Sequence, residues 1–228
     1  MGIILGFLCL FCFCLLITKA LTRKLHLKKL DKFLMKAHKP VCATFIIICI
    51  LHIIFVLPVL KTRHMYVFLT GIATVVVMIL LIVLCHIIKQ DRSLKIRWHR
   101  ILSAVMLLCI IGHIVIYYVD FMNYQTKIKD IQISEINTSN IKDGNYIGEY
   151  DAGYIYAKVE VSIKDGQIDN INLLEHHNER GTPAEKIIDE IIIKQQINVD
   201  TVSGATNSSM VIEKAVENAL ENASTTIQ

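Results

Sequence analysis

Four histidines occur as two pairs with the same spacing, each pair within an apolar stretch. His38 and His52 are fourteen residues apart, and so are His99 and His113. Fourteen residues make about 3.9 turns of α-helix and rise about 21 Å, so the members of each pair lie on one face at different depths. Ionisable side chains inside membrane helices are costly and usually functional. Two such helices side by side would offer two imidazole pairs, and each pair could hold one haem iron from both faces.

A second chemical signal is a hydroxyl-rich stretch near the carboxy terminus, with the sequence DTVSGATNSS over residues 200–209. A glycine interrupts it, and a helical pattern begins directly after it. The free N–H groups and the positive dipole at a helix start suit a phosphate group. Serine and threonine are also common as simple helix caps, so the pattern alone leaves a phosphate site and a cap as alternatives.

Four apolar segments long enough to cross a bilayer are expected to position the histidines. They cover residues 3–21, 38–60, 65–88 and 99–119. Hydrophobic residues make up 54% of the 228-residue chain, and most of this excess lies before residue 120. The first segment could instead be a signal peptide, but it lacks a basic start and a small-residue cleavage site, so we expect a retained helix.

Basic residues predict the orientation of these helices. Seven of them lie at residues 23–39, up to the start of the second span, and five lie at residues 89–100, up to the start of the fourth span. The segment between the second and third spans carries two. The two basic segments should be cytoplasmic, which places His38 and His99 at the inner level and His52 and His113 at the outer level. Everything after residue 120 should then be extracytoplasmic. The stretch 25–37 is either a surface helix or an extension of the second span, and His86 is a spare residue that we expect at the interface.

We divide the chain into a four-helix transmembrane domain (1–122), a polar linker (123–141) and a small α+β domain (142–228). In the last part, alternating β-type residues surround the turn Lys164–Gly166 and predict a hairpin. A helix capped by Thr182 should run to about Lys194, and a second one from Ser208 to Glu221.

Residues 142–221 resemble the FMN-binding domain of the sodium-pumping NADH:quinone reductase and of related ferredoxin-oxidising complexes. The resemblance rests on Asp-x-x-Ser-Gly-Ala-Thr at 200–206 and on the strand–turn–strand VSIKDGQI at 161–168. It implies that a flavin transferase attaches FMN covalently to Thr206 through its phosphate. The implied cofactor-binding residues are Thr206, Asp200, Ser203, Gly204, Ala205, Ser208, His176, His177, Glu179, Gly181 and Thr182.

The histidine-bearing helices resemble those of membrane cytochromes b and of ferric-reductase-like proteins, which usually have more than four helices. The resemblance implies two b-type haems with His38, His52, His99 and His113 as axial ligands. The expected fold class is therefore an α-helical membrane bundle of four transmembrane helices plus a small α+β extracytoplasmic FMN-binding domain.

Together these features predict an electron-transfer flavocytochrome, an oxidoreductase component of a bacterial cytoplasmic membrane. Electrons would enter from a quinol or a cytoplasmic reductase, cross two haems, and leave through FMN to an extracytoplasmic acceptor. The alternatives are a haem-free anchored flavoprotein and a flavin-binding sensor or assembly protein. No group of catalytic acid, base and nucleophile is recognisable. Nucleic-acid binding is not indicated, because topology accounts for the basic residues.

Overall fold

The computed structural model describes residues 1–87 and 91–225 of the chain, which form two compact units. The helical unit comprises Met1–Leu60 and Met65–Tyr117. The carboxy-terminal unit comprises Lys61–His64 and the chain from Tyr118 onward. The short segment Lys61–His64 therefore lies among the residues of the carboxy-terminal unit, although it joins two helices of the other unit.

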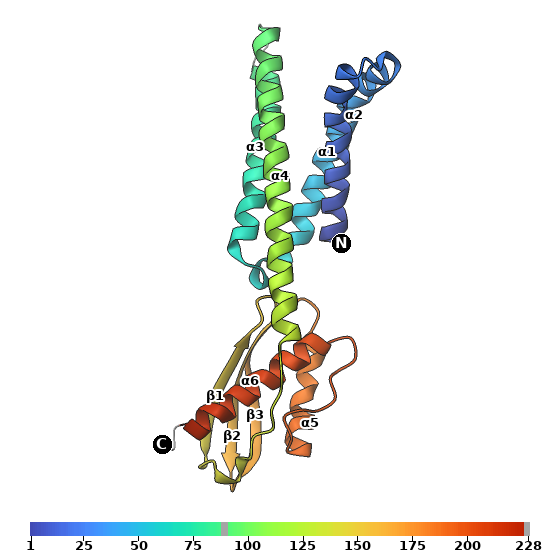
Figure 1. Cartoon of the computed structure of the whole chain (residues 1–228). Helices are drawn as coiled ribbons and strands as arrows, with labels where there is room; N and C mark the ends of the chain where they lie inside the picture. Colours follow the sequence, from blue (N-terminus) through green and yellow to red (C-terminus); the bar gives the residue numbers. More distant parts are fainter. Residues whose placement is uncertain (88–90, 226–228) are drawn as a thin grey trace. The chain divides into compact units, whose positions relative to one another are not determined.

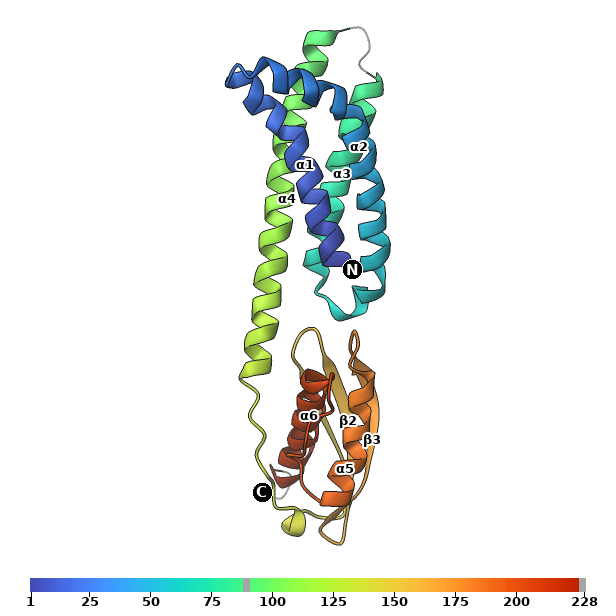
Figure 2. The same cartoon turned by 90° about the vertical axis from the view of Figure 1, so that its right-hand side faces the viewer.

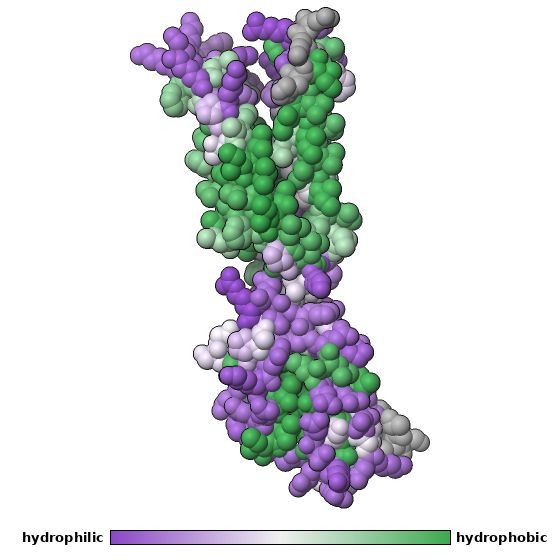
Figure 3. All heavy atoms as spheres, turned by 180° about the vertical axis from the view of Figure 1, so that it is seen from behind, coloured by the Kyte–Doolittle hydropathy of each residue, from purple (hydrophilic) through white to green (hydrophobic). Residues whose placement is uncertain are grey.

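Four long helices make up most of the amino-terminal half (Figure 1). They are α1 (Gly2–Lys24), α2 (Lys28–Val56), α3 (Met65–Ile87) and α4 (Arg92–Lys129), with the 3-10 helix η1 (Leu57–Thr62) after α2. Each is long and apolar enough to cross a membrane. Their outward-facing side chains are apolar, as the hydrophobic colouring over the helices shows (Figure 3). Phe7, Leu69 and Leu108 have exposed fractions of 63%, 57% and 68%, which suits contact with lipid. The chain is therefore a membrane protein, as expected.

The observed helices differ from the predicted spans mainly at their ends. The basic stretch 25–37 is largely an extension of the second helix, because α2 begins at Lys28 and continues through Pro40. The fourth helix starts seven residues before His99 and ends ten residues after Val119. Residue 88, the predicted end of the third span, lies outside the described residues, and the side chain of His86 is likewise not described.

Within the helical unit, α1 and α2 pack directly on each other. Phe13 and Phe45 meet with ring centroids 6.1 Å apart, and both are buried. Met78 of α3 and Met106 of α4 complete the buried cluster. Flexible methionine side chains can fill irregular space between helices.

The carboxy-terminal unit contains a three-stranded antiparallel sheet in the order β1-β2-β3 (Figure 2). The strands are β1 (Gly144–Asp151), β2 (Tyr156–Lys164) and β3 (Gln167–His177). Asp165 and Gly166 form the β2–β3 turn with φ of 51° and 75°, as an Asp-Gly hairpin turn requires. The residues of β2 alternate between buried and less buried positions, so that one face of the sheet forms the core. This confirms the predicted α+β class.

Helices cover the core face of this sheet. Helix α6 (Thr206–Thr225) packs on β1 and β2, and α5 (Ile187–Lys194) packs on β3. The approach of α6 to β1 is close, because a Cβ on Gly148 would lie 2.2 Å from the Ala215 carbonyl oxygen. The predicted cap at Thr182 is wrong: Gly181 occupies the N-cap position of a short 3-10 helix, η3 (Thr182–Lys186), with no side-chain cap.

The segment 123–141, predicted as a linker, contributes to the core of this unit. Helix α4 continues to Lys129, and a second 3-10 helix, η2, covers Thr138–Asn140. Ile131 and Ile141 are buried. The Glu135 carboxylate accepts hydrogen bonds from the backbone N–H groups of Ile197 and Asn198 at 3.1 and 2.8 Å. The polar composition of the segment 123–141 did not predict this role, because only a few spaced isoleucines supply its packing.

Candidate functional site

A tight turn places Thr206 at the start of α6. The Ala205 N–H donates to the Val202 carbonyl at 2.9 Å, and Gly204 adopts a φ of +78° at the third position of the turn. This conformation favours glycine, which explains the Gly204 of the motif. The Ser209 hydroxyl accepts from the Val202 N–H at 3.1 Å and ties the turn to the first turn of the helix. Thr206 itself is exposed, so its hydroxyl is accessible beside the unpaired first amides of α6.

A buried carboxyl group supports the segment that precedes this turn. Glu213 of α6 has an exposed fraction of 2%, and its carboxyl oxygen accepts from the Val199 N–H at 3.1 Å. Burial raises the pKa of Glu213 to about 7, and the nearby Glu135 carboxylate adds to the rise, while the Val199 N–H opposes it. Val199, three residues before the turn, is therefore held by a carboxyl group whose pKa is raised by burial.

The bend after β3 meets the first turn of α6 at Gly181. A Cβ on Gly181 would lie 1.8 Å from the Ser208 hydroxyl oxygen, so only glycine allows this approach. The Asn178 side-chain oxygen accepts from the Gly181 N–H at 2.7 Å and fixes the bend. Ser208 is buried two residues after Thr206. The structure thus brings Gly181 and Ser208 together, as a shared cofactor site would require.

His176 lies at the base of the same bend with one ring nitrogen held and the other open. Its side chain is 3% exposed, and its Nδ1 lies 2.9 Å from the Glu185 carboxylate of η3. The Asn178 side-chain nitrogen lies 3.2 Å from the same Nδ1. Within the described chain, Nε2 is buried with no hydrogen-bond partner. Such an atom points to a bound polar partner, because leaving a buried polar atom unpaired costs free energy.

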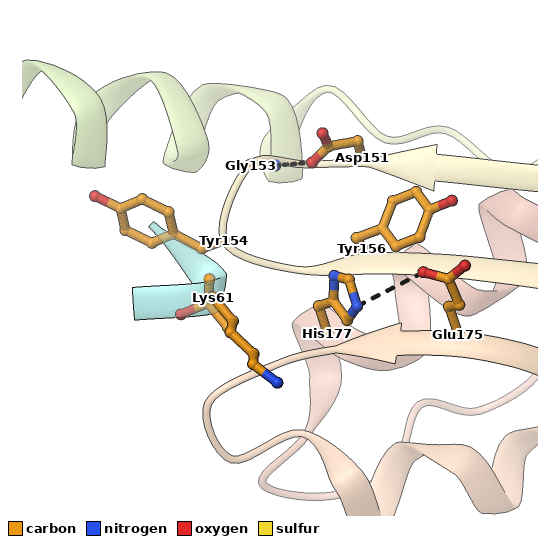
Figure 4. A pocket seen from close by; sticks show the side chains of 8 residues that line it. Lys61, Asp151, Gly153, Tyr154, Tyr156, Glu175 and His177 are labelled. Carbon is orange, nitrogen blue, oxygen red and sulfur yellow. Dashed lines mark hydrogen bonds and ion pairs between the residues drawn. The ribbon is translucent and has the colours of Figure 1, made fainter. Parts of the chain in front are cut away.

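His177 faces the other side of the sheet, because neighbouring residues in a strand alternate. It lies at a pocket of about 280 Å³ with Tyr156, Glu175, Asp151 and Lys61 (Figure 4). The His177 ring pairs with Glu175 at 3.6 Å and lies 5.4 Å from the Tyr156 ring. Burial and the hydrogen bond to Glu149 raise the pKa of Tyr156 to about 12. The structure therefore does not group His177 with Gly181 and Ser208.

The remaining predicted residues of this site have different surroundings. Glu179 pairs with Arg63, a residue that the sequence pattern did not single out. Ala205 is buried beneath the turn. The other predicted residues are exposed; they are Asp200, Ser203, Gly204 and Thr182.

The inner histidine pair comes together in the helical unit. The ring centroids of His38 on α2 and His99 on α4 are 6.3 Å apart, with the planes at 72°. A metal–imidazole bond is about 2 Å long. Two such bonds plus the two ring radii span about this separation, so the pair fits a single metal ion held between the rings.

In the outer pair, neighbouring helices fix the tautomers of both rings. His52 Nδ1 lies 2.9 Å from the Gly2 carbonyl oxygen of α1. His113 Nδ1 lies 2.9 Å from the Thr70 hydroxyl, which itself donates to the Val67 carbonyl at 2.7 Å. Both acceptors require a proton on Nδ1, so both rings present a bare Nε2, the form that binds a metal.

Two glycines allow neighbouring helices to approach these two rings closely. A Cβ on Gly6 or Gly71 would lie 3.3 Å from the Cε1 atom of His52 or His113, respectively. A Cβ on Gly112 would meet nothing within 4 Å. The pattern missed Gly2, Gly6, Thr70 and Gly71, although glycine in an apolar helix was a visible signal. Among the residues described, no group of three or more metal-binding side chains is found.

The fold and sites define a membrane protein with a small α+β domain built around a hydroxyl-rich helix start. Residues 152–221, about a third of the chain, match the model of the FMN-binding domain family. The match supports FMN as the cofactor of this domain and a flavin-based role in electron transfer. No curated protein and no solved structure matches the chain in the comparisons made.

Proposed function

We propose that this chain is a transmembrane electron-transfer protein with two b-type haems and an FMN joined covalently to Thr206. The observation that carries the proposal is the match of residues 152–221 to the FMN-binding domain, together with the exposed Thr206 hydroxyl at the start of α6. FMN, when bound, would supply the one- and two-electron chemistry that no side chain of this site offers.

Covalent attachment suits the position of Thr206. Its hydroxyl is accessible to a modifying enzyme, here a flavin transferase. The first amides and the dipole of α6 would stabilise the remaining charge of a phosphodiester at this residue. The bond would also keep the cofactor in place on the outer side of the membrane, where a dissociated FMN would be lost. The buried Nε2 of His176, which has no hydrogen-bond partner within the described chain, supplies a polar contact for the flavin.

Two features of the helical unit support haem binding. The 6.3 Å separation of the His38 and His99 rings fits one iron between them. The hydrogen bonds of His52 and His113 leave Nε2 bare in both rings. Haems at these positions would supply one-electron carriers at two depths of the bilayer, while the helices orient the ligands and exclude water.

The distribution of charge supports the orientation. Arg97, Arg100 and Lys95 begin α4 near His99 and suit the propionates of an inner haem on the cytoplasmic side. The carboxy-terminal domain would then face outward. Electrons from a quinol or a cytoplasmic reductase would pass the inner and outer histidine pairs, reach the flavin, and leave for an extracytoplasmic acceptor.

The test is an absorption spectrum of the detergent-purified chain, oxidised and reduced, combined with flavin fluorescence in a denaturing gel. Thr206→Val should abolish the fluorescent band, whereas Thr201→Val, in the same loop, should retain it. His99→Ala and His113→Ala should each remove about half of the haem absorbance, and His26→Asn should remove none.

The outcomes separate the competing functions. Flavin without haem bands would reduce the helices to an anchor for a flavoprotein. Haem without covalent flavin would exclude the role of Thr206. A bound flavin that membrane reductants cannot reduce would indicate a sensor or assembly protein.

A further inference from the structure

Arg63 is a largely buried cation within the carboxy-terminal unit, supplied by the segment between α2 and α3. Its side chain has an exposed fraction of 13%, and its Nη2 pairs with the Glu179 carboxylate. The other terminal nitrogen, Nη1, is buried and has no hydrogen-bond partner among residues 1–87 and 91–225. Leaving a charged donor unpaired in a buried position is costly, so an acceptor that is not part of the chain would stabilise it.

An aromatic stack connects Arg63 to the start of α6. The guanidinium carbon lies 3.3 Å from the centroid of the Tyr154 ring. Tyr154 stacks on Tyr124 with centroids 4.7 Å apart and planes at 16°. The Tyr124 hydroxyl accepts from the Asn207 side chain at 2.9 Å, and Asn207 follows Thr206 directly. Tyr154 also lines the pocket at His177, and Figure 4 shows its ring directed away from His177 and Glu175.

A second connection runs through Glu179. This residue lies two positions before Gly181, whose backbone contacts Ser208 in the first turn of α6. Arg63 therefore reaches the surroundings of Thr206 by two routes, through the tyrosines and through the bend at 176–181. His176, whose buried Nε2 has no hydrogen-bond partner within the described chain, lies in this same bend.

The unpaired Nη1 of Arg63 is a donor that suits a carbonyl oxygen on the edge of the flavin ring. We propose that Arg63, supplied by the segment between α2 and α3, binds the flavin and completes its site. The inference rests on the proposed FMN at Thr206 and adds a residue outside the matched range 152–221.

The proposal predicts that neutralising the two partners of this ion pair shifts the flavin midpoint potential in opposite directions. A guanidinium beside the ring stabilises the negative charge that reduction adds, so Arg63 should raise the flavin midpoint potential. Arg63→Gln should therefore shift the potential down. Glu179→Gln should shift it up, because Arg63 then keeps its charge without its carboxylate partner. If the ion pair only held the bend in place, both substitutions would shift the midpoint potential in the same direction, since both break the pair.

The experiment is a redox titration of the full-length, flavin-loaded chain in detergent, followed by flavin absorbance. Lys61→Gln is the matched control, because it removes the same charge from the same segment at an exposed side chain, which lines the pocket at His177. A downward shift in Arg63→Gln that exceeds the shift in Lys61→Gln, with an upward shift in Glu179→Gln, is the expected result.

Two results would overturn this inference and leave the proposed function intact. One is shifts of the same sign in Arg63→Gln and Glu179→Gln, and the other is equal shifts in Arg63→Gln and Lys61→Gln. If Arg63→Gln does not fold, the sign of the shift in Glu179→Gln decides. Gel fluorescence identifies the other kind of failure, because an unsubstituted chain without attached flavin overturns the proposed function itself.

Discussion

The hydroxyl group of Thr70 illustrates how a single residue sets the chemistry of another helix. It donates to the Val67 carbonyl and accepts from His113 Nδ1, so the ring keeps its proton on Nδ1 and its lone pair on Nε2. Hydrogen bonds to the outer nitrogen of a metal-bound histidine orient the ring and make it a stronger electron donor. On the proposed function, Thr70 is thus a positioning residue for the outer haem.

Thr70→Val removes this acceptor with little change in shape. We expect the midpoint potential of one of the two haems to rise, because its His113 ligand donates less electron density. A spectroelectrochemical titration of the haem bands measures the shift. Thr74→Val is the control, since Thr74 donates to the Thr70 carbonyl at 3.0 Å one turn along the same helix. Equal shifts in the two variants, or none in either, would contradict the assignment.

At the scale of elements, helix α6 organises the flavin-binding domain. It covers the sheet, presents Thr206 at its first position, and holds two other segments through buried glutamates. Glu213 accepts from Val199, and Glu217 accepts from the Ser134 N–H at 3.2 Å. On the proposed function, a helix that carries the attachment site and also anchors the preceding loop would give the bound group a fixed position.

The raised pKa of Glu213 predicts a dependence of stability on pH. Because its pKa is about 7 in the folded domain and 4.5 ordinarily, the folded state binds this proton more tightly than the unfolded chain does. Its contribution is therefore fully present below about pH 4.5 and is lost as the pH rises through about 7. Across this window, the free energy of unfolding should fall by roughly 1–3 kcal/mol.

Glu213→Gln should flatten this dependence while keeping an acceptor for the Val199 N–H. Hydrogen exchange of the α6 amides in the full chain, corrected for intrinsic rates between pH 5 and 8, measures it. Glu221→Gln, at the exposed end of the same helix, should leave the dependence unchanged. A Glu213→Gln variant with the pH dependence of the unsubstituted chain would rule out Glu213 as its source.

At the scale of the whole molecule, the proposal requires that the chain face both sides of a membrane in a defined sense. The basic segments that connect α1 to α2 and α3 to α4 favour a cytoplasmic location for those two connections. An odd number of spans then separates them from the carboxy-terminal domain. The sense of electron transfer depends on this orientation, because the flavin must face the acceptor.

Cysteine labelling in intact cells tests the orientation. Asp169→Cys, on the exposed side of β3, should react with a membrane-impermeant maleimide, whereas Lys29→Cys should react only after the cells are opened. The unsubstituted chain gives the baseline for its seven native cysteines. The reverse pattern would place the flavin in the cytoplasm and reverse the proposed path.

The sequence by itself determined the class of the molecule. In a bilayer, the backbone hydrogen bonds of a run of about twenty apolar residues are satisfied within a helix. The Asp-Gly turn between alternating strands defines a hairpin. Both are local patterns, which the sequence shows directly. The motif ending at Thr206 indicated the FMN-binding domain that the family comparison supports. Spacing placed His38 and His99 at one level, but their mutual distance depended on how two helices pack.

Only the tertiary structure decided which distant residues meet. It placed Gly181 against Ser208, turned His177 away from His176, and inserted Arg63 beside Glu179. It also made the segment 123–141 part of the core and replaced the expected cap at Thr182 with one at Gly181. These features follow from contacts between segments far apart in the chain, whose energies depend on packing and burial that no local pattern records.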